Sequence, residues 1–353
     1  MDKLKPFTKK IPETEKAEFN GGAKFCNGDT VMARITPCLE NGKTAYVDML
    51  DDGEIGFGST EFIVMRAKAG ISDPQFVYYT AINPTFRNVA IKSMVGSSGR
   101  QRVQQSVLEE LELSVPGLDE QRRIGAFLAE LDEKIALNNK INDNLLAQAQ
   151  TLYKQFFPYG VQDDLPDGWR IGTVGEIIEI HDSKRIPLSG ADRSKMEKKI
   201  YPYYGAASLM DLVDNYIFDG KYLLLGEDGT VVDDAGYPIL QYVWGQFWVN
   251  NHAHILTGRL GYDVESLYML FKQTPVKSIV TGAVQPKISQ ANLRSVQVVI
   301  PPEHNLREYN DLVEPLFSLF RANEEECKTF TALRDTLLPK LMSGEIDVSA
   351  VQL

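Results

Sequence analysis

Two long stretches of the chain repeat apolar residues at helical spacing. Between Ile124 and Phe156 the apolar positions recur every three or four residues, which places them along one face of a helix. Residues 303–345 show the same spacing. A first helix from Asp119 to Phe157 would contain 39 residues and measure roughly 60 Å at about 1.5 Å per residue. Its dimensions are those of a spacer.

The two stretches are copies of one another, related by a shift of 185 residues. Apolar positions of the first are matched by apolar positions of the second, with Arg334 as the one polar partner. The first set is Ile124, Leu128, Leu131, Ile135, Leu145, Ala149, Leu152 and Phe156; the second is Tyr309, Val313, Leu316, Phe320, Phe330, Arg334, Leu337 and Leu341. This pattern predicts that each stretch carries the apolar contact face, or seam, of a coiled coil. The alternative is two separate amphipathic helices, each covering its own domain.

Polar residues and prolines interrupt the seam at specific points. Asn138 and Asn142 fall on it, and Asn138 corresponds to Asn323. A polar seam residue costs stability but favours the register in which it finds a partner, so we expect these asparagines to lie close together. Pro315 removes a helical hydrogen bond, which predicts a kink or a new helix start there. Pro339 followed by Gly344 predicts the end of the second helix.

The repeat continues upstream, where short strand patterns and turns replace the helical spacing. The glycine-bearing stretches 96–102 and 281–287 align, and residues 25–35 resemble 216–226 at a slightly larger offset. Each copy is therefore a strand-rich unit followed by a long helix. The second opens at LPDGW (165–169), but Met1 aligns with position 186 (1 + 185), so the first has no counterpart of 169–185. We predict units at 1–117 and 158–302, and helices at 118–157 and 303–345.

Composition is typical of a globular intracellular protein. The 353 residues are 43% apolar, enough for two cores, and no apolar run approaches the roughly 18 residues that span a bilayer. With no leader at the start, we expect a cytoplasmic protein. Three widely spaced cysteines argue against a disulfide framework or a cysteine-based metal site.

Charge is unevenly distributed. A net charge of −11 argues against nucleic acid as a partner. Between Lys184 and Lys199, however, six basic residues stand against two acidic ones, which forms a local basic island. An ordinary solvated loop of mixed charge remains the alternative.

Together these sequences resemble a known family. PGLDEQRRIGAFLAELDEKIALNNKIN, LPDGW, ISQANLRSVQVVIPP and LRDTLLPKLMSGEIDV, in that order, resemble the specificity subunits of type I restriction-modification systems over nearly the whole chain. The resemblance implies an α+β fold with two target recognition domains in pseudo-twofold repeat, separated by helices that pair as an antiparallel coiled coil. It departs from the family pattern at its abbreviated start, and it would allow the C-terminal end to stand beside that gap.

The resemblance also implies the partners. Each recognition domain would read one half of a split site in double-stranded DNA, and the helices would fix the spacing. Two methyltransferase subunits would dock on the helices, and restriction subunits would complete the full complex. This chain would be non-catalytic and without a cofactor or metal of its own, while S-adenosylmethionine and ATP would bind partner subunits.

Base reading needs donors and acceptors on short loops, and phosphate contacts need cations or backbone amides. In the first unit the candidates are Arg34, Lys43, Ser59, Ser97, Ser98, Gly99, Arg100 and Arg102. In the second they are Lys184, Arg185, Tyr204, Gly205, Asp228, Gly229, Thr230, Asn250, Asn251, His252, Thr281, Gly282, Gln285 and Lys287. The aligned glycine loops are the strongest candidates, with ordinary surface turns as the alternative. For subunit contact we predict the seam residues Leu128, Leu131, Ile135, Asn138, Asn142, Leu145, Leu316, Phe320, Asn323, Phe330 and Leu337.

Enzyme motifs are weak. INPTF (82–86) resembles an adenine methyltransferase loop without its second proline, and no phosphate-binding glycine loop occurs. GEDGTVVDD (226–234) offers carboxylates but is interpreted as a tight turn between strands. His252 and His254 share a strand face, where buried or hydrogen-bonded histidines are commoner than a metal pair, and Trp244 and Trp248 are expected in the core. The rival of another class is a coiled-coil scaffold without sequence-specific DNA binding.

Overall fold

The computed structural model describes residues 1–282 and 284–348, and the chain divides into two compact units. Unit 1 contains Met1–Lys140 together with the chain from Asn323 onward, and unit 2 contains Ile141–Ala322. The two long helices, α4 (Leu118–Phe156) and α9 (Glu303–Met342), each contribute a part to both units. The fold is α+β, as predicted, but each compact unit includes helix from both repeats.

Unit 1 builds small antiparallel sheets and packs helices on them. One sheet has the order β3-β2-β5, and β1 pairs with β4. Its elements are β1 (Ala23–Phe25), β2 (Thr30–Ala33), β3 (Thr44–Tyr46), β4 (Gly56–Gly58), β5 (Phe62–Met65), α1 (Pro74–Ile82), α2 (Pro84–Lys92) and α3 (Gln105–Glu109). The INPTF motif lies where α1 meets α2, and the Asn83 side chain caps α2 by accepting a hydrogen bond from the Thr85 N–H. That motif is a helix junction.

Unit 2 contains two four-stranded sheets, ordered β12-β11-β14-β7 and β10-β13-β8-β9, and the pair β15-β6. The strands are β6 (Arg170–Thr173), β7 (Ile178–Ile180), β8 (Tyr201–Tyr204), β9 (Leu209–Val213), β10 (Phe218–Asp219), β11 (Tyr222–Gly226), β12 (Leu240–Val243), β13 (Gln246–Val249), β14 (Ala253–Gly258) and β15 (Gln297–Ile300). The helices are α5 (Val174–Ile177), η1 (Asp182–Lys184), α6 (Gly190–Ser194), α7 (Val264–Phe271), η2 (Lys277–Ile279) and α8 (Gln290–Arg294). Trp248 is buried, as predicted.

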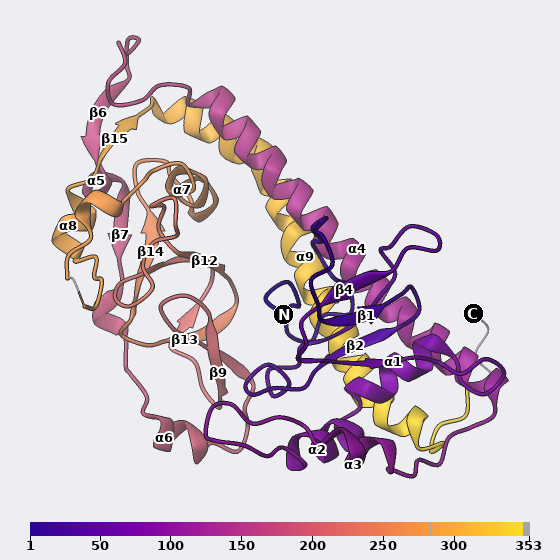
Figure 1. Ribbon diagram of the computed structural model, residues 1–353. Coiled ribbons are helices and arrows are strands. Elements are labelled where there is room, and N and C mark those ends of the chain that lie inside the picture. The colour runs from indigo at the N-terminus through magenta and orange to yellow at the C-terminus, as the bar shows by residue number, and fades with distance from the viewer. Residues whose placement is uncertain (283, 349–353) are drawn as a thin grey trace. The chain divides into compact units, whose positions relative to one another are not determined.

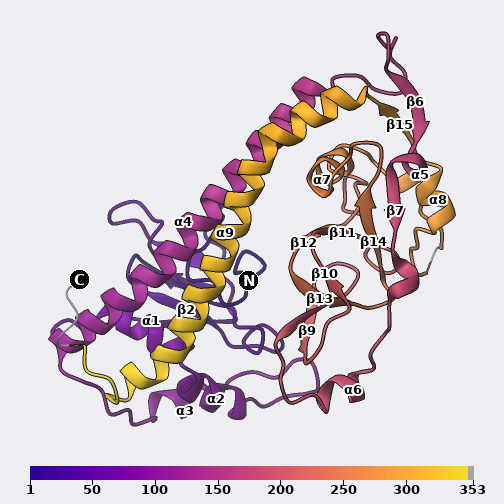
Figure 2. The same ribbon diagram turned by 180° about the vertical axis from the view of Figure 1, so that it is seen from behind.

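The long helices α4 and α9 pack side by side and run antiparallel (Figure 1 and Figure 2). In unit 1 Asn138 Nδ2 donates to Glu326 at 2.6 Å, and in unit 2 Asn142 Nδ2 donates to the Phe320 carbonyl at 3.3 Å. Tyr309 donates to the Ala149 carbonyl at 3.1 Å. All predicted seam residues are buried or half-buried: Leu128, Leu131, Ile135, Asn138, Asn142, Leu145, Leu316, Phe320, Asn323, Phe330 and Leu337. The prediction of paired helices is confirmed.

The expected break at Pro315 is wrong. The chain stays helical from Glu303 through Pro315 to Met342, because packing on the other helix outweighs the hydrogen bond that proline cannot donate. The observed end of α9, at Met342, is close to the predicted end of the second helix. Gly344 adopts φ +74°, and its N–H donates to the Leu341 carbonyl. Beyond it, Val348 is buried with Ile124 and Phe76 in the core of unit 1.

Among the helices of residues 1–282 and 284–348, none is long and apolar enough to cross a membrane.

Candidate nucleic-acid interface

In unit 2 a glycine loop, residues 281–287, is docked by main-chain hydrogen bonds. Thr281 and Lys287 exchange N–H···O bonds of 2.8 and 2.7 Å and close the loop. Gly282 has φ +85°, and a Cβ there would lie 2.2 Å from the Gln285 carbonyl oxygen, so only glycine fits. The Gly229 N–H donates to the Pro286 carbonyl, and the Ile288 N–H donates to that of Glu227. The loop is therefore fixed to the end of β11.

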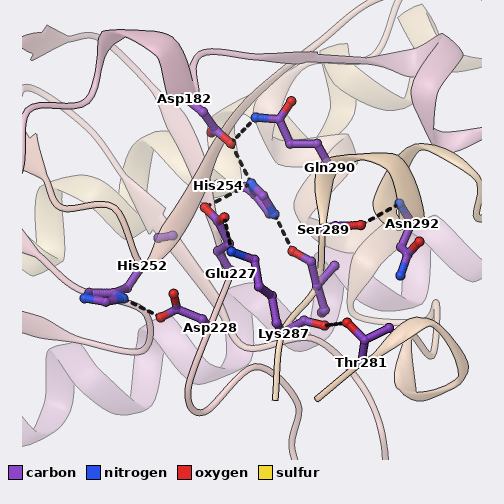
Figure 3. Close-up of polar contacts among 12 residues, drawn as sticks. Asp182, Glu227, Asp228, His252, His254, Thr281, Lys287, Ser289, Gln290 and Asn292 are labelled. Atoms are coloured by element: carbon purple, nitrogen blue, oxygen red, sulfur yellow. Dashed lines mark hydrogen bonds and ion pairs between the residues drawn. The ribbon is translucent and has the colours of Figure 1, made fainter. Parts of the chain in front are cut away.

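Below this loop lies a buried charge network (Figure 3). His254, on β14, is fully buried; its Nδ1 lies 2.6 Å from Asp182 Oδ2 and its Nε2 lies 2.8 Å from the Ile288 carbonyl oxygen. Asp182 also accepts the Ile255 N–H and the Gln290 side-chain amide. Both ring nitrogens of His254 therefore lie within hydrogen-bond distance of an oxygen atom.

Glu227 joins this network to the loop cation. Arg185 Nη1 donates to Glu227 at 2.6 Å, and Lys287 Nζ lies 3.2 Å from the other oxygen of Glu227 (Figure 3 shows Lys287 against Glu227). Burial alone would raise the pKa of Glu227, but the hydrogen bond from Arg185 and nearby positive charges outweigh it and lower that pKa. Burial likewise opposes ionisation of Asp182, yet the contact with His254 leaves its pKa lowered. Both groups remain ionised at neutral pH.

The trio Asp182, Glu227 and His254 brings ligand atoms within 4.8 Å of one another, close enough to consider a metal ion. The surrounding contacts do not fit one. His254 already has an oxygen acceptor at each ring nitrogen, and the Arg185 guanidinium and Lys287 ammonium compensate the carboxylates. The trio is instead a positioning network for the glycine loop of unit 2.

Unit 1 docks its own glycine loop, residues 95–102, with the same hydrogen bonds. Val95 and Arg102 exchange N–H···O bonds, as Thr281 and Lys287 do. The Val103 N–H donates to Arg34 as Ile288 donates to Glu227, and the Thr36 N–H donates to Gln101 as Gly229 donates to Pro286. The predicted alignment holds at the C-terminal end of the two loops, where Arg102 matches Lys287, and is one residue off at the start, where Val95 rather than Gly96 matches Thr281.

One detail of the predicted alignment changes. The shared bonds match Arg34 to Glu227, which is an offset of 193 (227 − 34). The sequence comparison of 25–35 with 216–226 used 191 (216 − 25) and is shifted by two residues. Similarity between short apolar strands does not fix their register, because a slip of two keeps every side chain on its face.

Each unit also pairs its loop cation with a carboxylate. In unit 1 Arg102 makes a two-pronged contact with Glu61 at 2.7 and 2.9 Å, and this hydrogen bond lowers the pKa of Glu61. The Arg102 and Lys287 side chains are 45% and 48% exposed, so the outer side of each cation faces solvent. Each glycine loop thus presents to solvent a cation that a carboxylate of the same unit holds in place.

The structure places the remaining predicted residues as follows. In unit 1, Ser97, Ser98, Gly99 and Arg100 are exposed on the loop, while Arg34, Lys43 and Ser59 are half-buried. In unit 2, Thr281, Gly282, Gln285, Lys184, Thr230 and Asn251 are exposed, Asp228, Gly229, Tyr204 and His252 are half-buried, and Asn250 and Gly205 are buried. His252 contacts Asp228 beside Gly229, so these join the loop cluster (Figure 3).

Two candidates have structural roles. Arg185 is 13% exposed and bonded to Glu227 and the Ala253 carbonyl, and Gly205 is buried against Met210. The basic island is also partly neutralised, because Arg193 and Lys199 both pair with Asp211. Sequence analysis did not identify Asp182 or Glu61, and it interpreted the stretch that contains Glu227 as a turn, because acids far apart in the chain reveal no shared partner. The expectation that His254 is a buried, hydrogen-bonded histidine is confirmed.

This network predicts how unit 2 responds to acid. Since the folded pKa values of Asp182 and Glu227 lie below their ordinary 3.8 and 4.5, their ionisation stabilises the fold above about pH 4.5 and is lost as pH falls through the folded values. Asp182→Asn should cost about 1–3 kcal/mol at pH 7 by placing an amide opposite two donors, and it should flatten the dependence on acid.

The measurement is urea unfolding from pH 7 to pH 3, followed by tryptophan fluorescence. All three tryptophans, Trp169, Trp244 and Trp248, belong to unit 2, so the signal reports this unit. Glu179→Gln, which removes a carboxylate that is 50% exposed and lies 3.7 Å from Arg259 in unit 2, is the control and should change little. Identical acid profiles for Asp182→Asn and the unsubstituted chain would contradict the assignment.

The fold and the matched loops define a duplicated protein whose two units present equivalent polar surfaces and share a pair of long helices. Comparison with known proteins agrees. Residues 7–147 and 166–326 match the family described as the type I restriction modification DNA specificity domain. The chain belongs to this family, which favours the specificity-subunit interpretation over a coiled-coil scaffold.

Individual relatives have the same description. The type I restriction enzyme MjaIX specificity subunit of Methanocaldococcus jannaschii is 22% identical over 306 residues, covering 78% of this chain and 69% of that protein. The EcoAI specificity subunit of Escherichia coli is 38% identical over 104 residues, 30% of this chain and 18% of that protein. A crystal structure of the type I S subunit from M. genitalium has the same fold, with a TM-score of 0.54, 18% identity, and coverage of 97% and 90%.

Proposed function

We propose that this chain is the non-catalytic subunit that reads a split site in duplex DNA, with one unit on each half. The observation that carries the proposal is the glycine loop, docked by the same hydrogen bonds in both units and ending in an outward-facing cation, Arg102 or Lys287. Such loops approach phosphates closely, and neighbouring side chains such as Asn251 and His252 supply donors and acceptors for base edges.

The long helices would provide the spacing. α4 and α9 each run from one unit into the other without interruption, so they would hold two weak half-site readers at one separation. Tethering raises the effective concentration of the second contact, but only for sites whose halves are correctly spaced. The spacing then becomes part of the recognised sequence.

Two methyltransferase subunits, one for each repeat, would dock on this chain, and restriction subunits would join them in the full complex. These partners would bind S-adenosylmethionine and ATP, and the methyltransferases would flip the target adenine out of the duplex. The chain would contribute position and sequence choice, and the partners the chemistry.

Methylation mapping tests the function. The chain is produced in cells with its methyltransferase partner, and single-molecule sequencing records modified adenines. We expect one motif of two short halves with a fixed gap, modified in both halves. Methylation without a motif, or no retention of DNA by the complex in a gel shift at moderate salt, would favour a scaffold and contradict the proposal.

Residue roles are tested on the identified duplex. Arg102→Ala and Lys287→Ala should weaken binding to all sequences alike and reduce the slope of log K against log salt by about 1 each. Asn251→Ala should instead change which DNA sequences bind most tightly, by about 1–3 kcal/mol of binding free energy for each affected base pair. Fluorescence anisotropy over a salt series measures both. If the two classes of variant behaved alike, the division into phosphate and base contacts would be wrong.

A further inference from the structure

The two units differ in how the strand that precedes each long helix is covered. In unit 2 this strand is β15, which pairs antiparallel with β6 from Gln297↔Thr173 to Ile300↔Arg170. Its counterpart in unit 1 is residues 112–115 (297 − 185 to 300 − 185). Within the described parts of the chain, no strand pairs with 112–115. Residues 112–115 lie outside the named helices and strands of unit 1.

Side-chain burial shows the same difference at equivalent positions. Val298 and Ile300 of β15 are 4% and 5% exposed, whereas their counterparts Leu113 and Val115 are 43% and 50% exposed. Leu293 of α8 is fully buried, but its counterpart Leu108 of α3 is half-buried. Unit 1 therefore leaves an apolar strip, with Leu113 and Val115 exposed and Leu108 half-buried, where unit 2 buries the same positions.

Unit 2 shows what covers such a strip. β6 pairs with β15, and α5 then packs on α8 with Val174 and Ile177 fully buried. After α5, β7 pairs with β14 from Ile178 to Ile180. In unit 1 the counterpart of β14 is β5, and in the residues described here the sheet ends at β5. The strip and this sheet edge are the surfaces that residues 170–180 occupy in unit 2.

A groove beside the strip has room for one more part of that segment. Unit 1 has a groove of about 300 Å³ whose lining includes Phe86, Leu113, Val115 and Met342. The shift of 185 matches Leu113 to Val298 (113 + 185) and Met342 to Phe157 (342 − 185), and in unit 2 Val298 and Phe157 line a groove with Trp169. The unit 1 groove is thus the counterpart of the groove that the half-buried Trp169, just before β6, helps to line in unit 2.

We propose that residues 105–115 of unit 1 form an acceptor for a polypeptide segment with the sequence pattern of residues 169–180. That segment would begin with an aromatic residue, add an antiparallel strand to 112–115, and cover α3 with apolar residues at the positions of Val174 and Ile177. Strand addition supplies main-chain hydrogen bonds, and the apolar positions supply specificity. The inference concerns the folding of unit 1 and does not depend on DNA binding.

The test uses a fluorescent peptide of residues 165–181 and the full chain. We expect saturable, one-to-one binding by anisotropy. A peptide with Ile177→Asp should bind at least about tenfold more weakly, because that position becomes fully buried. A peptide with Ile171→Ser is the matched control, since Ile171 is 48% exposed in unit 2, and it should bind within about twofold of the unsubstituted peptide.

The acceptor is tested by a substitution in the full chain, Val115→Lys. Because Val115 is exposed, this change should leave the chain folded and weaken binding of the peptide. Hydrogen exchange should slow at 111–115 when the peptide binds, with no change at 297–300. Absence of saturable binding, equal binding of the Ile177→Asp peptide, or protection at 297–300 would overturn the proposal. So would a dimer of the chain alone that already protects 111–115, since a second copy would then be the occupant.

Discussion

Replacing Arg334 by methionine is expected to lower the free energy of unfolding by about 3–5 kcal/mol, the cost of leaving a buried carboxylate without its partner. Arg334 on α9 and Asp132 on α4 form a 2.6 Å ion pair in unit 1, with side chains only 8% and 7% exposed. Asp132 also accepts the Tyr79 hydroxyl at 2.6 Å, and burial together with that carboxylate raises the pKa of Tyr79. Removing the arginine leaves Asp132 without its ion-pair partner and with only the buried Lys9 ammonium, which donates to the Tyr79 hydroxyl, as a nearby positive charge.

Urea unfolding followed by circular dichroism measures the loss. Adding Asp132→Asn to Arg334→Met should restore part of the stability, because the amide oxygen still accepts from Tyr79 and the buried carboxylate is gone, while the buried Lys9 remains. Asp335→Asn is the control: Asp335 also pairs with Arg334 but is 59% exposed, and its loss should cost less than about 1 kcal/mol. Additive losses in the double variant would contradict this account.

Replacing Gly282 by valine is expected to weaken binding to the full split duplex by about 10²–10⁴-fold, because one of two tethered contacts is lost. Valine is strained at φ +85° and collides with the Gln285 carbonyl, so the glycine loop of unit 2 cannot form. Binding to a duplex carrying only the half read by unit 1 should be unchanged. Anisotropy on the complex with its methyltransferase measures both affinities.

Gly245→Val supplies the matched control. Gly245 also lies in unit 2 with φ +76°, but nothing lies within 4 Å of its added Cβ. It should cause similar backbone strain and leave DNA affinity within a few fold. Equal losses from Gly282→Val and Gly245→Val would indicate general destabilisation and remove the loop from the interface.

Sequence predicted the long-range architecture of this protein better than its site. The spacing of apolar residues located α4 to within one residue at each end, because one continuous helical face leaves a long periodic signal. The shift of 185 also located both glycine loops. The sequence also predicted a kink or a new helix start at Pro315. The helix continues through this residue because packing along the whole of α9 outweighs the local cost of one proline.

The polar residues around the glycine loops could be predicted from the sequence only in part. Loop cations and glycines could be found from the repeat, but the groups behind them could not. Asp182, Glu227 and His254 come from three separate segments and meet only in the folded unit. The basic residues near Arg185 in the sequence predict a surface cation, but the side chain turns inward to Asp182, three residues away, and to Glu227 and Ala253, 42 and 68 residues away. Charge along a chain does not say which side chains turn inward.

The main-chain anchoring of the two glycine loops has a consequence for divergence. Arg34 and Glu227 carry opposite charges at equivalent positions, yet each accepts the same N–H bond through its carbonyl oxygen. Anchors of this kind tolerate any side chain that leaves the backbone path intact. The surface above them can therefore change its chemistry in one half of the duplicated protein while the other half keeps its own, and new combinations of preference need no redesign of the supporting framework.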